Sequence, residues 1–462
     1  MLNIFKNPLV VSWLNSLIGL LSFIVIVPVA SEYFTETQFT LWLFSSSVIA
    51  IAIIFETSVS VVFTRMLTGY LEAEKLEALK QGSDELKDAI SGFLISSCVL
   101  YAAAASLGGV FAWLVARVSV GGLVELGLAE SEARSTIIAF GVAAGSSIIL
   151  SYPRSILIAI RKLHMQRVFM LTNTAFKVIL SLLLIVFVSR VDVLMVLYVG
   201  LNIVESFLLL FFIGPVLRGR TIVLPKFVFL KDFVQPFLRT LVIRVGGYLT
   251  LYSSALIVVR HAPADADSYL LSFRLAQAGA SVSMIPVSIC LPALARLRKR
   301  ILVGENEASD FVESALRVIF FGVTCMLLLL GVLLFVGPSL IEYVSSKSLL
   351  PFTALSVLCL VFFFDGHNQA HAMVYETQNK VPYFLVSLCS GISILVLSYY
   401  LVPVFSIWGA LIAMVAALVA VNGWIAVWYN LSEWGVGISV YIKTAIVQVP
   451  RPSISKLINP DS

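Results

Sequence analysis

The sequence is poor in charged residues. Lys, Arg, Asp and Glu make up 12% of its 462 residues, whereas an average soluble domain carries roughly 25%. Hydrophobic residues reach 60%, and the mean hydropathy is +1.00. This balance excludes a soluble globular protein. The alternating segments of about ten residues that would build an outer-membrane barrel are also absent, so we predict an all-α, polytopic membrane protein.

The sequence also lacks the motifs of two kinds of site, those for metal or disulfide bonds and those for ATP. The five cysteines form no close pairs and no metal-ligand spacing, which argues against a disulfide framework or a zinc site. No nucleotide-binding loop of the GxxxxGK[ST] type occurs, so ATP is not expected to be the direct energy source. We expect a protein that is not an enzyme and has no cofactor.

Apolar runs of about 20 residues, each long enough to cross a hydrocarbon core of roughly 30 Å, recur along the chain. They predict twelve transmembrane helices. The expected spans cover residues 9–31, 39–64, 91–116, 136–160, 168–189, 193–215, 240–259, 268–295, 314–337, 350–374, 382–402 and 405–429.

The basic residues are distributed unequally between the connections. One side of the predicted membrane holds 21 lysines and arginines, the other side holds 5, and 5 more fall within spans. Because basic connections stay in the cytoplasm, both termini are predicted to be cytoplasmic. The formal net charge of +5 then faces anionic lipid headgroups, and nucleic acid is not expected as a partner.

The hydropathy pattern repeats once. The first half opens with "NPLVVSWLNSLIGLLS" and the second with "QPFLRTLVIRVGGYLT". Because each half has an even number of spans, the pseudo-two-fold axis is predicted to lie along the membrane normal. The predicted parts are an N-terminal six-helix lobe (1–216), a cytoplasmic linker (217–239), a C-terminal six-helix lobe (240–430) and a cytoplasmic interfacial tail (431–462).

Several ionisable residues fall within predicted spans, where each costs at least about 2.5–3.5 kcal/mol to insert and usually faces the bundle interior. A positively lined cavity would attract an anion, and arginine can grip phosphate with two hydrogen bonds. Alternatively, the charges pair with one another, as Arg154 with Asp365 and Lys177 with Glu205. The candidate cavity cations are Arg154, Lys177, Arg244 and Arg274, and the acids are Glu56, Glu205 and Asp365.

A polar run, "FFFDGHNQAH", ends the tenth predicted span. Three interpretations remain open. Asp365, His367 and His371 have the side chains of a metal site, but their spacing does not bring all three to one helix face. The run could instead join helices through hydrogen bonds. As a third possibility, His367 and Asn368 contact substrate, or His367 relays protons.

Prolines within spans predict kinks that would suit a moving transporter. Pro153 lies in the fourth span, and Pro286 and Pro292 lie in the eighth. The "RVGGY" stretch that begins at Arg244 is expected to loosen the seventh span. Such hinges suit alternating access.

The layout of the chain resembles a known group of proteins. The twelve spans in two halves, the N-terminal "NPLVVSWLNSLIGLLSFIVIVPV" and the charged loop after the second span are similar to the polysaccharide and O-antigen flippases. These belong to the multidrug/oligosaccharidyl-lipid/polysaccharide exporter superfamily. The resemblance covers residues 5–430. It implies movement of a polyprenyl-diphosphate-linked oligosaccharide across the bacterial inner membrane, through a cationic cavity and driven by ion antiport.

Within this resemblance, the four intramembrane cations are the candidate substrate-binding residues, together with His367 and Asn368. Glu56, Glu205, Asp365 and His367 are the candidates for coupling or proton relay. Membrane lipids and a polysaccharide polymerase complex are expected partners. The alternatives are a drug/cation antiporter or a peptidoglycan-precursor flippase on the same fold, and a membrane polysaccharide polymerase.

Overall fold

A computed structural model describes residues 8–78, 84–217, 227–302, 308–377, 383–439 and 441. These residues are helical apart from short connections, which confirms the predicted all-α class. The helices before the middle of the chain are α1 (Pro8–Tyr33), α2 (Glu36–Ala78), α3 (Asp84–Glu125), α4 (Glu130–Leu150), α5 (Tyr152–Ala159), α6 (Leu163–Phe187) and α7 (Val191–Leu217).

The remaining elements include one short 3₁₀ turn and one π-helical turn. They are α8 (Phe227–His261), η2 (Pro263–Asp265), α9 (Ala266–Ser283), α10 (Ile285–Leu302), α11 (Ala308–Phe335), α12 (Gly337–Val344), α13 (Phe352–Glu376), α14 (Phe384–Phe405), α15 (Ile407–Ala417), η3 (Leu418–Asn422) and α16 (Ile425–Trp434).

The chain forms two compact units. The first contains Met1–Tyr248 and Ala255–Asp267, and the second contains Leu249–Ser254 and Ser268–Ser462. In the first unit α3 packs against α2 and α4, and α6 packs against α1 and α7. In the second, α11 packs against α10 and α13, and α14 packs against α15. Helix α8 begins at Phe227, within the segment expected to link the lobes.

All twelve predicted spans fall on helical segments. Ten helical segments of the described chain are long and apolar enough to cross a membrane. The apolar part of α1, Leu17–Tyr33, is shorter than these ten segments. Helix α13 has 25 residues, but its polar run lowers its hydropathy. The described fold is therefore that of a multi-pass membrane protein.

Prolines break two of the helices. The fourth predicted span is divided at Ser151, and α5 then starts with Pro153 in its first turn. The eighth is divided between Ser283 and Ile285, immediately before Pro286. Proline lacks an N–H group and clashes with the preceding turn, which explains both breaks. Pro292 lies within α10 without a break, and α8 stays continuous through Gly246 and Gly247.

Helices α3 and α4 approach each other closely along a row of small residues. A Cβ atom on Gly109 would lie 2.9 Å from the carbonyl oxygen of Gly141, and one on Gly145 would lie 3.0 Å from the carbonyl oxygen of Ala105. Small residues four apart allow membrane helices to pack backbone to backbone. Side chains larger than hydrogen at these glycines would push α4 away from α3.

The turn between α14 and α15 is a single residue, Ser406. Ser406 takes a left-handed φ of 51°, and the N–H of Gly409 donates to the carbonyl of Ser406. A Cβ atom on Gly409 would lie 2.4 Å from the carbonyl carbon and oxygen of Leu401. Glycine at position 409 therefore lets α15 begin directly against the end of α14.

Polar and apolar side chains are arranged as expected for lipid surroundings. Large apolar side chains such as Phe187, Phe335 and Val404 are exposed. In contrast, Asn173 and Glu205 are buried.

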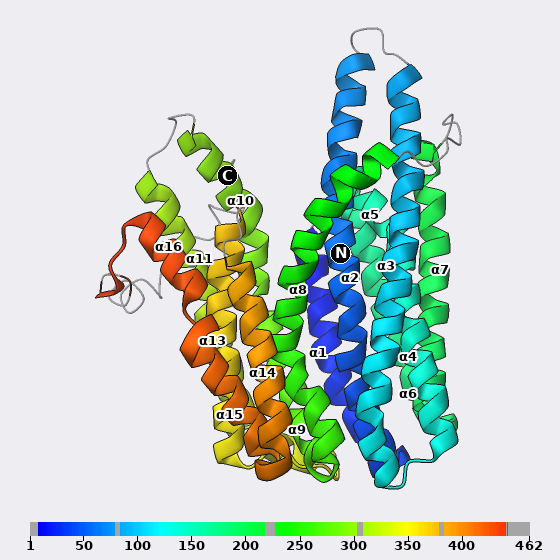
Figure 1. The fold of residues 1–462 in the computed structure, drawn as a ribbon, viewed down its shortest axis with the longest axis vertical. Helices are drawn as coiled ribbons and strands as arrows, with labels where there is room; N and C mark the ends of the chain where they lie inside the picture. The colour runs from blue at the N-terminus through cyan, green and yellow to red at the C-terminus, as the bar shows by residue number, and fades with distance from the viewer. Residues whose placement is uncertain are drawn as a thin grey trace. The chain divides into compact units, whose positions relative to one another are not determined.

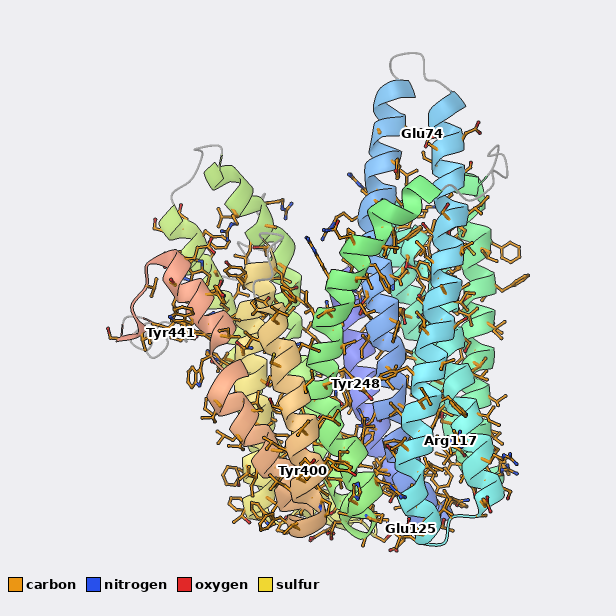
Figure 2. The ribbon with its side chains drawn as sticks, in the orientation of Figure 1. Glu74, Arg117, Glu125, Tyr248, Tyr400 and Tyr441 are labelled. Carbon is orange, nitrogen blue, oxygen red and sulfur yellow. The ribbon has the colours of Figure 1, made fainter. Side chains whose placement is uncertain are left out.

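Helices α2 and α3 of the first unit extend together beyond their neighbours, with Glu74 near one end of the unit and Glu125 at the other (Figures 1 and 2).

Candidate functional site

The first unit contains a network of buried and half-buried charges. Arg154 on α5 forms a two-pronged ion pair with Glu205 on α7: Nε lies 2.7 Å from one carboxylate oxygen and Nη2 lies 2.6 Å from the other. Glu56 on α2 lies 3.8 Å from Nη1 of the same guanidinium. The Glu205 side chain is 3% exposed, whereas that of Glu56 is 25% exposed. Arg154 therefore holds two acids from different helices.

Amide groups extend this network toward a lysine. Asn173 on α6 donates to Glu205 and, over 3.3 Å, to Oδ1 of Asn202 on α7. The Lys177 ammonium donates to the same Asn202 oxygen at 2.8 Å and lies 5.7 Å from the centre of the Tyr198 ring. No carboxylate of the described residues is within ion-pair distance of Lys177. Its positive charge is thus held by an amide and a ring.

These contacts decide between the pairings considered from the sequence. Glu205 pairs with Arg154 and not with Lys177, so both pairs named as alternatives were wrong. Arg154 and Lys177 balance Glu56 and Glu205 when all four are ionised. Arg154 is therefore a guanidinium already bound to carboxylates. Lys177 is the cation of this network whose ammonium group contacts an amide and an aromatic ring.

The break between α4 and α5 positions Arg154. Ser151 ends α4, and the new helix starts at Tyr152, whose hydroxyl donates to the carbonyl of Leu94 over 2.8 Å. Ser155, one residue after Arg154, bonds to Tyr101 at 2.8 Å and to Ser60 at 2.7 Å. These contacts fix α5 against α2 and α3. The sequence indicated a kink here, but gave no sign of the hydroxyl contacts.

A second polar group lies in the second unit, where α8 and α9 supply its members. Arg274 donates to the side-chain oxygen of Gln277 over 2.7 Å. The guanidinium lies 5.4 Å from the centre of the Tyr252 ring and 5.8 Å from that of Phe273. Gln277 also donates to the Tyr252 hydroxyl. A guanidinium and an amide that lie within one turn of α9 are therefore gathered at a half-buried aromatic ring of α8.

The polar run of α13 forms a third group. His367 and His371 both contact the hydroxyl of Tyr441, at 2.7 and 2.8 Å. Asn368 accepts a hydrogen bond from the backbone N–H of Ala426 at 3.0 Å. Asn430 on α16 donates to the carbonyl of His371 at 2.7 Å. These contacts support the interpretation in which the run joins helices.

Two other predicted site residues take no part in these contacts. Arg244 is exposed on α8, and Asp365 is half-buried on α13. Neither has an ion-pair partner among the residues that the structure describes. No group of three His, Cys, Asp or Glu side chains in the described ranges is arranged to hold a metal ion. Asn173, Asn202 and Gln277 were not predicted, because amides leave no charge signal in a sequence.

The fold defines a class: the chain has the all-α polytopic architecture of the MATE and MurJ transporters. No protein-family model matches the chain, and no curated protein matches it either. Among solved structures it is similar in fold to MATE and other MOP superfamily transporters and to the lipid II flippase MurJ.

Three of these neighbours cover nearly the whole chain. An inward-facing multidrug resistance MATE family transporter of the MOP superfamily has a TM-score of 0.62 and 13% identity, over 93% of this chain and 96% of that one. The lipid II flippase MurJ, in an inward closed conformation, has a TM-score of 0.60 and 16% identity, over 95% and 89%. A MOP superfamily transporter from Pyrococcus furiosus has a TM-score of 0.56 and 12% identity, over 94% and 96%.

Proposed function

We propose that this protein moves a polyprenyl-diphosphate-linked oligosaccharide across the bacterial inner membrane by alternating access through a cationic cavity. The observation that carries the proposal is the cation Lys177, held by Asn202 and the Tyr198 ring instead of a carboxylate. A diphosphate can take up hydrogen bonds from such an ammonium. The likeness in fold to a lipid II flippase supports a lipid-linked substrate.

In this proposal each polar group contacts a different part of the substrate or of the site. Lys177, Arg244 and Arg274 supply positive charge for the diphosphate, and Arg154 orders the acids around it. Gln277 and Tyr252 provide an amide and a ring of the kinds that suit a sugar. The α13 residues His367 and Asn368 remain candidates for contact with the substrate.

Ion coupling is assigned to the carboxylates. Glu56 is the more exposed acid of the first network, and its distance from Arg154 is longer than that of Glu205. It can therefore take up H⁺ or Na⁺ without breaking the two-pronged pair. Glu205, Asp365 and His367 are the further candidates for this step. A polymerase of the same polysaccharide is the expected partner for the exported unit.

Neutral substitutions of the two cations test the proposal. Lys177→Gln and Arg274→Gln are each expected to reduce export of surface polysaccharide tenfold or more in a deletion strain, because a charge-assisted hydrogen bond contributes about 1.5–3 kcal/mol. The amount of protein in the membrane should be unchanged. Export is measured as lipid-linked oligosaccharide reaching the outer face.

Lys162→Gln is the matched control, because Lys162 is exposed and bonds only weakly, to the carbonyl of Phe212 at 3.4 Å. It should export normally. Normal export by both Lys177→Gln and Arg274→Gln would refute the cationic cavity. A drug/cation exporter would instead keep its activity, or gain it, when these positive charges are removed.

The proposed orientation is tested separately with single cysteines, after the five native cysteines have been replaced by serine. Glu130→Cys lies in the first turn of α4, and Glu74→Cys lies near the end of α2. We expect an impermeant maleimide to label Glu130→Cys in intact cells and Glu74→Cys only after permeabilisation. The opposite pattern would reverse the proposed topology.

A further inference from the structure

The polar run of α13 is covered by a tyrosine from beyond α16. The Tyr441 hydroxyl lies 2.7 Å from Nε2 of His367 and 2.8 Å from Nε2 of His371. Both histidines and the tyrosine are buried. The histidines are four residues apart, so their rings share one face of α13 and converge on a single oxygen atom.

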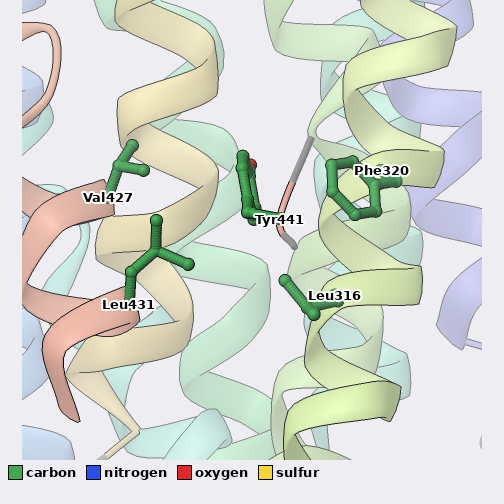
Figure 3. Packing of buried hydrophobic residues seen from close by; sticks show 5 residues of the cluster. All are labelled: Leu316, Phe320, Val427, Leu431 and Tyr441. Carbon is green, nitrogen blue, oxygen red and sulfur yellow. The ribbon is translucent and has the colours of Figure 1, made fainter. Parts of the chain in front are cut away.

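The Tyr441 ring fills a space between two helices. It packs among Leu316 and Phe320 of α11 and Val427 and Leu431 of α16 (Figure 3). Its centre lies 5.1 Å from that of the Phe320 ring. Burial of an aromatic side chain of this size removes about 150–250 Å² from solvent. The ring therefore ties the segment after α16 to α11 and α13.

The hydrogen bonds around Tyr441 allow only one assignment of protons to the His367, His371 and Tyr441 side chains. The Asn430 side-chain nitrogen, a donor, lies 3.2 Å from Nδ1 of His371. Nδ1 must therefore be an acceptor, and the His371 proton sits on Nε2, from which it is donated to the tyrosine oxygen. The Tyr441 hydroxyl then donates to Nε2 of His367. Burial raises the pKa of Tyr441, so its hydroxyl keeps that proton.

An additional proton has no place in this chain of bonds. A second proton on His371 would point Nδ1–H at the side-chain nitrogen of Asn430, which is itself a donor. A proton on Nε2 of His367 would point at the hydroxyl hydrogen of Tyr441. Either event sets two donors against each other, and the buried hydroxyl or amide then loses its acceptor, which costs about 1–3 kcal/mol.

The surrounding charges do not offset such a proton. On the packed helices, Arg298 of α10 pairs with Glu433 of α16, and Glu313 pairs with Arg317 within α11. On α13 itself, Asp365 is two residues before His367, so it projects from another side of the helix. In the described chain, none of these carboxylates forms an ion pair with either histidine.

We propose that Tyr441 is a latch that holds the segment after α16 onto α11 and α13 while His367 and His371 are neutral, and that protonation of these histidines releases it. This proposal does not depend on which molecule the protein transports. The latch makes acid a signal for loosening this part of the second unit, because a histidine that leaves the buried site regains an ordinary pKa near 6.5 and then binds a proton below that pH.

Hydrogen–deuterium exchange of the full-length protein in nanodiscs tests the latch. Protection factors for the peptide covering 425–441 are compared at pH 7.5 and pH 5.0, after correction for intrinsic exchange. We expect at least a tenfold loss of protection at the lower pH. Tyr441→Phe keeps the ring but lacks the hydroxyl, so its protection should be low at both pH values. The double variant His367→Gln/His371→Gln has no histidine to protonate at these positions. It should lose the pH step, which makes it a test independent of Tyr441→Phe.

Tyr383→Phe is the matched control, because it removes another buried hydroxyl that bonds to α13, at the carbonyl of Ala372. It should keep the wild-type pH step. The latch is refuted by the absence of a pH step in the wild type, or by a full step in either the Tyr441 variant or the double histidine variant.

Discussion

Replacement of Glu205 by glutamine is expected to lower the free energy of unfolding by about 3–5 kcal/mol, the usual cost of removing one partner of a buried ion pair. The Arg154 guanidinium would keep its charge in a site from which water is largely excluded. Asn173 would also face an amide in place of a carboxylate. Thermal unfolding in detergent, followed by tryptophan fluorescence, measures the loss.

Two controls separate this effect from a general sensitivity to charge. Arg190→Gln breaks a pair with Asp192 in which the arginine side chain is 51% exposed, and exposed pairs of this kind contribute little to stability. The double variant Arg154→Met/Glu205→Met removes both charges and should unfold closer to the wild type than Glu205→Gln does. If Glu205→Gln unfolded at the same temperature as the wild type, the buried pair would contribute nothing to stability.

Replacement of Gly409 by alanine is expected to destabilise the second unit by about 3 kcal/mol, the upper end of the range for overpacking. The added methyl group would overlap with the carbonyl of Leu401 and lie 2.6 Å from the backbone nitrogen of Val402. Backbone atoms cannot rotate away as a flexible side chain can, so α15 must shift as a whole. The midpoint of thermal unfolding and the yield of folded protein report the change.

Gly331→Ala on α11 is the comparison for this variant. A Cβ atom at Gly331 would meet nothing within 4 Å, and alanine favours a helix over glycine by about 0.8–1.0 kcal/mol. It should therefore leave stability unchanged or raise it slightly. Equal melting of both variants would mean that α14 and α15 do not need their close approach.

The positions of the helices could be predicted well because the hydrophobic runs are long and their ends are marked by polar clusters. The helix breaks before Pro153 and Pro286 followed from the chemistry of proline. The continuity of α8 through Gly246 and Gly247 did not follow from the sequence, because packing decides whether a helix tolerates glycine.

The partners of the intramembrane charges were harder to predict. Arg154 and Glu205 are 51 residues apart, and Asp365 was an equally acceptable partner from sequence. Tyr441 lies more than 70 residues after His367, in a segment whose aromatic composition suggested a membrane surface. Nothing local to "FFFDGHNQAH" indicated that a tyrosine would fill the space beside it. Contacts between distant segments need the fold.

The paired helices α2 and α3 have a practical consequence for imaging. Their 43 and 42 residues correspond to rods of about 63–65 Å at 1.5 Å per residue, roughly twice the hydrocarbon thickness of a bilayer. Much of this helical pair must therefore stand in water, away from the Arg154 network. An antibody fragment raised against it would add mass outside the detergent micelle and give single-particle images a rigid landmark.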